Sequence, residues 1–237
     1  MNHADLQQTI VDCLVEGGIW HRAVSLDIEA DLNTLDDPKK PVLSVSVSNR
    51  EFGEVKTRNF ILDSETQDSE LKLVGQLGEF CESIRPLVII GYNLNRFDLL
   101  ILSLKIRQLD RLFQTTHEYS SAYWALRETM GRSYFLDVID PVRFAISDMD
   151  HTSPRMVSLE NALQHKRFSH LPFIDSKEVA TRVQKERDLG RWEAIHYLWQ
   201  SDRTAFKKYI TGDSHDTLLL AEDLFGVKTP RKVGDKT

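Results

Sequence analysis

Four acidic residues from three distant parts of the sequence are of a type that could hold metal ions together. Asp27 and Glu29 lie in AVSLDIEA, Asp98 in GYNLNRFDLLIL and Asp213 in KKYITGDSHDTLLLAEDLF. Carboxylates gathered in one place repel one another, and Mg²⁺ or Mn²⁺ compensates them while leaving positions for phosphate oxygens. Two such ions, about 3.5–4 Å apart, can stabilise both the attacking and the leaving oxygen of a phosphoryl displacement. The four acids therefore indicate metal-dependent chemistry on a phosphate ester.

The spacing within each segment would direct these side chains to one side. Asp27 and Glu29 are two residues apart, so on a strand both project from one face, and the apolar residues between them project from the other. Tyr209 and Asp213 are four residues apart, which places them on one face of a helix. Gly212 is a poor helix former that is tolerated where another backbone or a ligand comes close. Each feature alone also fits a structural role, such as an acid in a first helical turn or a core aromatic.

The elements that must position these residues are predicted from hydrophobic periodicity. Strands are expected where apolar residues alternate or form short buried runs, and helices where they recur every three or four residues. The short turn at 49–53 predicts an antiparallel hairpin. The pattern predicts strands at 22–29, 41–49, 54–62, 87–93 and 133–142, and helices at 69–85, 95–108, 157–165, 176–187, 190–199 and 201–225. This order predicts an α/β fold with a mixed central β-sheet flanked by helices.

Composition limits the class of protein. The chain has 237 residues, 41% of them hydrophobic, and a net charge of −6, which argues against a global electrostatic grip on nucleic acid but not against a local basic groove. Cys13 and Cys81 lack metal-ligand spacing, so neither a zinc site nor a disulfide scaffold is expected, and a reducing cytoplasm fits. No run suits a membrane span or a signal peptide. We expect an N-terminal helix in 1–20, one domain in 21–226 and a flexible basic tail in 227–237.

At this point the motifs resemble a known family. SLDIEA, GYNLNRFDLLIL and YITGDSHDTLLLAEDLF resemble, in order, the three motifs of the DEDD superfamily of 3′–5′ exonucleases, which share a ribonuclease-H-like fold. The closest resemblance is to the proofreading exonuclease domain of family B DNA polymerases, and MVSLENALQH (156–165) resembles a further helix of that domain. One branch of the superfamily has His five residues before its last Asp, where this chain has Lys208. The other has Tyr four residues before it, as Tyr209 is here, so the sequence resembles the Tyr subtype.

The resemblance implies roles for the motif residues. Asp27, Glu29 and Asp213 would hold the metal that activates a water, and Asp27 with Asp98 would hold a second metal that stabilises the departing 3′ oxygen. Tyr209, with an ordinary pKa near 10, would orient the water rather than act as a base. The remaining expected residues contact the terminal nucleotide: Asn93 by hydrogen bonding and Phe97 by packing on a base, with Ala30 and Tyr92 beside them. Phe97 as a core residue is an equal alternative.

The expected activity is hydrolysis at the 3′ end of single-stranded nucleic acid, with DNA favoured over RNA, two Mg²⁺ or Mn²⁺ ions and release of nucleoside 5′-monophosphates. Because no polymerase domain follows in the sequence, we expect a stand-alone relative whose partner is a polymerase or another nucleic-acid enzyme acting in trans, not a membrane. Segment 110–132 carries no motif. Candidate groove residues are Arg96, Arg107, Arg111, Arg132, Lys207 and Lys208. Two alternatives stay open: a non-catalytic nucleic-acid-binding subunit on the same fold, and a ribonuclease-H-like endonuclease.

Overall fold

The structure, a computed structural model, describes residues 3–31, 40–115, 117–153, 155–174 and 176–227. Its centre is a five-stranded sheet of order β3-β2-β1-β4-β5. The strands are β1 Ala23–Ala30, β2 Val42–Glu51, β3 Glu54–Ile61, β4 Val88–Gly91 and β5 Tyr134–Asp137. β1 runs antiparallel to β2 and parallel to β4, and β4 runs parallel to β5. The predicted fold class, α/β with a mixed sheet flanked by helices, is confirmed, and the topology is consistent with a ribonuclease-H-like fold.

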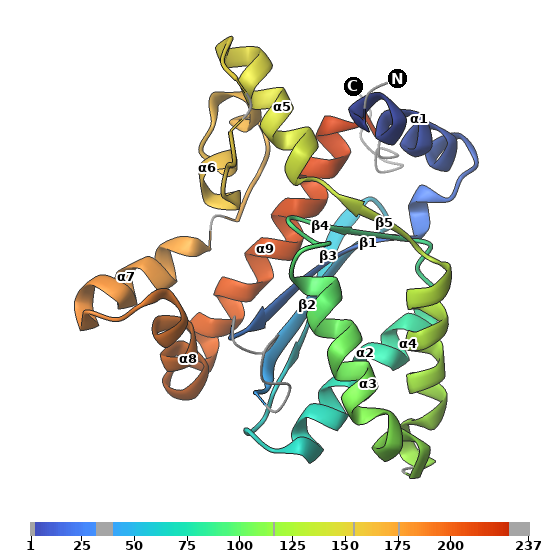
Figure 1. Cartoon of the computed structure of the whole chain (residues 1–237). Helices are drawn as coiled ribbons and strands as arrows, with labels where there is room; N and C mark the ends of the chain where they lie inside the picture. Colours follow the sequence, from blue (N-terminus) through green and yellow to red (C-terminus); the bar gives the residue numbers. More distant parts are fainter. Residues whose placement is uncertain (1–2, 32–39, 116, 154, 175, 228–237) are drawn as a thin grey trace.

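Helices cover both faces of this sheet, as Figure 1 shows. They are α1 His3–Glu16, α2 Gln67–Ile84, α3 Asp98–Thr115, α4 Ser120–Arg132, α5 Ile139–Asp150, α6 Leu159–Leu163, α7 Lys177–Arg187, α8 Arg191–Ser201 and α9 Arg203–Leu224. One face of the sheet packs its apolar side chains against α2 and α3, and α4 packs on these two helices. The other face is crossed by α9, and α1 packs beside the C-terminal part of that helix. No helix in the described part of the chain is long and apolar enough to cross a bilayer.

The predicted hairpin between β2 and β3 is confirmed, and its loop is only two residues long. Glu51 pairs with Glu54, and Phe52 and Gly53 between them have φ angles of 52° and 82°. Positive φ at both positions is the geometry of a type I′ turn, which matches the twist of the flanking strands. The hairpin fixes β2 beside β1, on the side away from β4.

The sheet face under α9 is lined with small polar side chains. Ser25 on β1 donates to the carbonyl of Ser214 on α9. Ser46 and Ser48 on β2 lie 2.8 and 3.0 Å from the Ser214 hydroxyl. The alternation of Ser with Val or Leu in β2 therefore has two causes, because the apolar residues fill one core and the serines let α9 approach the other face closely.

Two sequence expectations need correction. The strand expected at 133–142 ends at Asp137, and α5 begins at Ile139. The Asp137 carboxylate accepts from the Ile139 backbone N–H at 3.2 Å, and Pro141 sits in the first helical turn, where its missing N–H costs nothing. The helix expected at 95–108 runs on to Thr115, so segment 110–132 contains the end of α3 and all of α4. The tail predicted at 227–237 lies outside the described residues from 228 onward.

Candidate active site

Asp27 and Glu29 project from β1 on the face opposite the apolar core. Leu26 and Ile28 belong to the core cluster, at 5% and 3% exposure, whereas Asp27 and Glu29 are only half-buried. One carboxylate oxygen from each acid and one from Asp213 all lie within 4.8 Å of one another. The two-residue spacing therefore does what the sequence predicts: it brings both acids to one face, where α9 adds a third.

α9 carries Tyr209 and Asp213 one turn apart, and both are buried. Gly212 between them is required by close packing, since a Cβ there would lie 2.0 Å from the Ser176 hydroxyl oxygen. Ser176 in turn donates to the Tyr209 backbone carbonyl at 2.7 Å. A close approach at Gly212 is present, but the nearest atoms belong to the side chain of Ser176, the residue before α7, and not to a ligand or primarily to another backbone.

Asp98 reaches β1 from the first residue of α3. β4 pairs with β1 only as far as Ser25, so beyond that point the edge of β1 is open. Asp98 Oδ1 accepts from the backbone N–H of Ile28 at 2.9 Å. This hydrogen bond holds Asp98 beside Ile28, the residue between Asp27 and Glu29 on β1. The Asp98 oxygens are not part of the group that Asp27, Glu29 and Asp213 form within 4.8 Å.

The acids raise one another's pKa values. Burial is the first cause, and it raises the pKa of Asp27, which the charges of Asp213, Glu29 and Asp98 raise further. Burial likewise raises the pKa of Glu29, to about 7, against the opposing effect of Lys177. The pKa of Asp98 and that of Asp213 are also raised by burial, opposed respectively by the Ile28 N–H and by Lys177. The cluster thus holds more negative charge than its protein surroundings favour.

Two cations that the sequence reasoning did not identify face this cluster. Lys177, the first residue of α7, is 7% exposed and donates to Asp213 Oδ2 and, at 3.1 Å, to Tyr209 Oη. Arg191, the first residue of α8, lies 3.4 Å from Glu160 and also hydrogen-bonds Tyr209. Neither lysine nor arginine stands at a diagnostic spacing from the motif acids, so no sequence signal could have found them. Only the folding of α7 and α8 beside α9 brings them here.

The Tyr209 hydroxyl is held between charges. Burial raises the pKa of Tyr209, and the negative charge of Glu29 raises it further, so the phenol keeps its proton. A hydrogen bond from this hydroxyl lowers the pKa of Glu29, while Lys177 donates to the same oxygen. A tyrosine that stays protonated and is held from two sides can orient a neighbouring group but cannot remove a proton from it.

Two adjoining cavities surround the carboxylates. The larger, about 740 Å³, is lined by all four acids, and the smaller, about 350 Å³, by Asp27, Asp213 and Lys177. Asn93 lines both cavities at a φ of 65°, and the Asp137 carboxylate accepts from its backbone N–H at 2.9 Å. The Asn93 Oδ1 atom is buried and has no hydrogen-bond partner. It is therefore free to accept a hydrogen bond from a bound molecule.

The other expected substrate contacts also border this space. Phe97 and Ala30 line the larger cavity and also pack on the apolar core. The core role of Phe97 is therefore confirmed, and its packing on a base stays a prediction. Tyr92 lines both cavities, and its hydroxyl donates to the Val157 carbonyl. Of the candidate groove residues, Arg96 lines the larger cavity, whereas Arg107, Arg111, Arg132, Lys207 and Lys208 are not among the lining residues of either.

The donor set fits a divalent cation. Asp27 Oδ2 is buried without any hydrogen-bond partner, and the nearest acids supply only carboxylate oxygens, which hard cations such as Mg²⁺ and Mn²⁺ prefer. An orphaned buried carboxylate oxygen is costly unless a cation or donor meets it. Asp27, Glu29 and Asp213 could thus bind a metal.

Comparisons with known proteins give one structural neighbour to report. No family model matches the chain, and no curated protein matches it. Among solved structures, the chain is similar to the family B DNA polymerase of the hyperthermophilic archaeon Pyrobaculum calidifontis, at 18% sequence identity and a TM-score of 0.47. The match covers 85% of this chain and 24% of the polymerase, so the chain spans about a quarter of that protein's length.

Proposed function

We propose that this chain is a metal-dependent 3′–5′ exonuclease of the DEDD superfamily, Tyr subtype, which hydrolyses the terminal phosphodiester of single-stranded nucleic acid. The observation that carries the proposal is the cluster of Asp27, Glu29 and Asp213 within 4.8 Å, with an orphaned Asp27 oxygen and with Asp98 on the adjoining edge of β1. These are the residues of the three motifs, and they come together from three separate elements. Structural ion pairs do not explain a site with more acids than cations.

Asp27, Glu29 and Asp213 would hold one cation, and Asp27 with Asp98 would hold the other. The chemistry that such cations supply is activation of a water and neutralisation of the charge that develops on the phosphate. The protein's own contribution begins with the rigidity of the cluster. β1 fixes two of the acids, and the hydrogen bond from Ile28 N–H fixes Asp98.

Lys177 and Tyr209 would complete the site on the α9 side. The ammonium of Lys177 accounts for one donor to the Tyr209 oxygen, so the tyrosine proton points elsewhere, toward Glu29 in this structure. In that orientation the hydroxyl can position the attacking water. Lys177 and Arg191 would add positive charge beside the bound phosphate. This charge would stabilise the transition state, in which negative charge develops on the phosphate oxygens.

The terminal nucleotide would occupy the larger cavity. Asn93 Oδ1 can accept a hydrogen bond from it, and the Phe97 ring can pack on its base. Packing on a ring does not discriminate among bases, so we expect broad sequence tolerance. The 740 Å³ of this cavity suits one or two nucleotides rather than a duplex, which is why single strands are the proposed substrate.

The test is a nuclease assay with 5′-labelled and 3′-labelled single strands of DNA and of RNA, in Mg²⁺ and in Mn²⁺. Asp213→Asn is expected to abolish activity, and Tyr209→Phe to lower kcat about 10²-fold or more with little change in KM, since orientation acts mainly in the transition state. Asp188→Asn serves as the matched control, because Asp188 is exposed and its φ of 54° suits asparagine.

The outcomes separate the alternatives. Stepwise shortening of 5′-labelled strands supports the proposal. Cleavage of circular single strands would instead indicate an endonuclease. Binding of strands with no cleavage in either metal, unchanged by Asp213→Asn, would indicate a non-catalytic binding subunit.

A further inference from the structure

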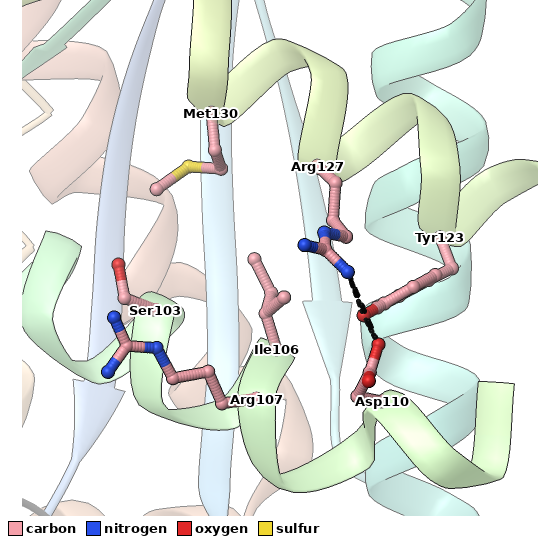
Figure 2. Close-up of a pocket in the computed structure, with 7 residues that line it drawn as sticks. All are labelled: Ser103, Ile106, Arg107, Asp110, Tyr123, Arg127 and Met130. Atoms are coloured by element: carbon pink, nitrogen blue, oxygen red, sulfur yellow. Dashed lines mark hydrogen bonds and ion pairs between the residues drawn. The ribbon is translucent and has the colours of Figure 1, made fainter. Parts of the chain in front are cut away.

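Part of segment 110–132, which carried no motif, lines a separate pocket away from the two cavities at the carboxylates. This pocket lies between α3 and α4 and has a volume of about 300 Å³. Figure 2 shows Ile106 projecting between Arg107 on one side and Arg127 with Tyr123 on the other. The pocket thus combines apolar side chains, among them Ile106 and Met130, with two guanidinium groups.

Arg127 is held in place by its neighbours. It lies 3.4 Å from Asp110 and 3.2 Å from the Tyr123 hydroxyl, which itself donates to Asp110. Its guanidinium also stacks 5.2 Å from the ring centroid of Trp124. Trp124 remains 56% exposed, so this surface offers an indole supported by a fixed cation.

α3 connects this pocket to the carboxylate cavity by a row of residues three or four apart. Arg96 lines that cavity just before α3 begins, and Leu100, Ser103, Arg107 and Arg111 follow along the helix. Arg107 and Arg111 are exposed, and within the described part of the chain neither has a carboxylate at ion-pair distance. Two uncompensated guanidinium groups one turn apart, about 6 Å along the helix axis, form a site for successive anions.

We propose that this α3–α4 surface binds the 5′-ward portion of a single-stranded nucleic acid whose 3′ end lies in the carboxylate cavity. The inference rests on the proposed function for the direction of the strand. Arg107 and Arg111 contact backbone phosphates, and Trp124 stacks on a base. Alternating cationic and aromatic contacts of this kind bind single strands with little regard to sequence. An acidic protein segment would use the arginines but would gain nothing from an open indole face.

The geometry gives the length at which the contact begins. Arg107 lies nine residues from Asp98 and Arg111 thirteen, or roughly 13 and 20 Å along α3 at 1.5 Å per residue. At roughly 3.4 Å per stacked nucleotide, these distances correspond to about four and six nucleotides. Strands of four nucleotides therefore reach no farther than Arg107, and longer strands engage the whole surface.

The experiment measures anisotropy of 5′-fluorescein oligothymidylates of 4 and 20 nucleotides, bound to the full-length chain in EDTA, so that no cleavage occurs. The double variant Arg107→Ala, Arg111→Ala is expected to weaken 20-mer binding roughly 25-fold at 0.1 M salt. Each lost phosphate contact lowers the slope of log K against log salt by about 0.7, so two contacts change K by about 10^1.4 between 1 M and 0.1 M salt. Affinity for the 4-mer should change much less, because this strand does not reach Arg111. The control, Lys56→Ala with Lys72→Ala, removes two exposed charges elsewhere and should leave both affinities nearly unaltered.

Trp124→Phe gives an independent readout, because stacking on a base quenches indole emission. Because Trp192 lines the cavity of the terminal nucleotide, both oligomers can quench its emission. The 20-mer is expected to quench the parent chain more than the 4-mer does, and the variant should lose that difference. Equal weakening for both lengths, no weakening in the arginine variant, or equally tight competition by polyglutamate would overturn the proposal. The assay contains no metal and no cleavage, so a chain without nuclease activity can still show the length-dependent loss. An active nuclease that lacks it refutes this inference alone.

Discussion

Replacing Glu29 with glutamine should stabilise the metal-free protein while removing its response to metal. Burial and the neighbouring acids hold the pKa of Glu29 at about 7 instead of 4.5. The folded state therefore binds this proton more tightly than the unfolded chain does, and stability falls as pH rises through the interval. The loss of folding stability that comes from ionising Glu29 is absent below pH 4.5 and complete above pH 7. A difference of 2.5 pKa units at about 1.4 kcal/mol each corresponds to about 3 kcal/mol.

The assay is urea and thermal denaturation of the parent chain, Glu29→Gln and Glu186→Gln, in EDTA at pH 5 and pH 8. At pH 8, Glu29→Gln should be the more stable by up to about 3 kcal/mol, or roughly 6–12 °C in Tm for a chain of this size. At pH 5 most of that gain should vanish. Glu186 is exposed on α7, so its variant should match the parent at both pH values. Adding Mn²⁺ should reverse the order, because binding to the folded state stabilises the chain that has the intact ligand set.

Two results would refute this reasoning. If Glu29→Gln is no more stable than the parent at pH 8 without metal, the carboxylate is not held in an unfavourable setting. If Mn²⁺ raises the Tm of the variant as much as that of the parent, Glu29 is not a ligand.

Two further perturbations test other parts of the site. Lys177→Met should lower the free energy of unfolding by about 3–5 kcal/mol at pH 8 in urea denaturation, because it leaves the buried Asp213 charge without its cation. Burial raises the pKa of Asp213, so the loss should shrink as the pH is lowered, and a loss independent of pH would contradict the assignment. Gly212→Ala should be strongly destabilising, since its Cβ would meet Ser176, whereas Gly131→Ala, with nothing within 4 Å, should be neutral or gain up to about 1 kcal/mol. Equal effects of the two alanines in denaturant titrations would show that close packing at α9 is not the reason for Gly212.

The sequence predicts the elements that have strong periodicity. The alternation in β1 and β2 locates both strands, and the short turn locates their hairpin. Spacing predicts that Asp27 and Glu29 share a face of β1 and that Tyr209 and Asp213 share a face of α9. The order of the motifs predicts that these two faces meet, and Asp27, Glu29 and Asp213 do come together.

Other features depend on contacts that no local pattern reveals. The end of β5 is set by the Asp137 side chain, which accepts hydrogen bonds from both the turn at Asn93 and the start of α5. Lys177 looks like an ordinary helical lysine until α7 folds against α9 and buries it. Arg107 is recognisable as a basic residue, but only the packing of α4 beside α3 shows that it borders a pocket away from the acids.

The serine-lined contact between the sheet and α9 has a consequence for how the site tolerates change. Because Ser46 and Ser48 meet Ser214 through directional hydrogen bonds, α9 cannot rotate or slide without breaking them. A shift of one residue would turn Asp213 by about 100° around the helix and away from Asp27. Apolar packing on the opposite face of the sheet, by contrast, can be rearranged at constant volume. The position of Asp213 relative to Asp27 thus depends on directional contacts between α9 and β2, in addition to the apolar residues that α9 and β1 place in the main core.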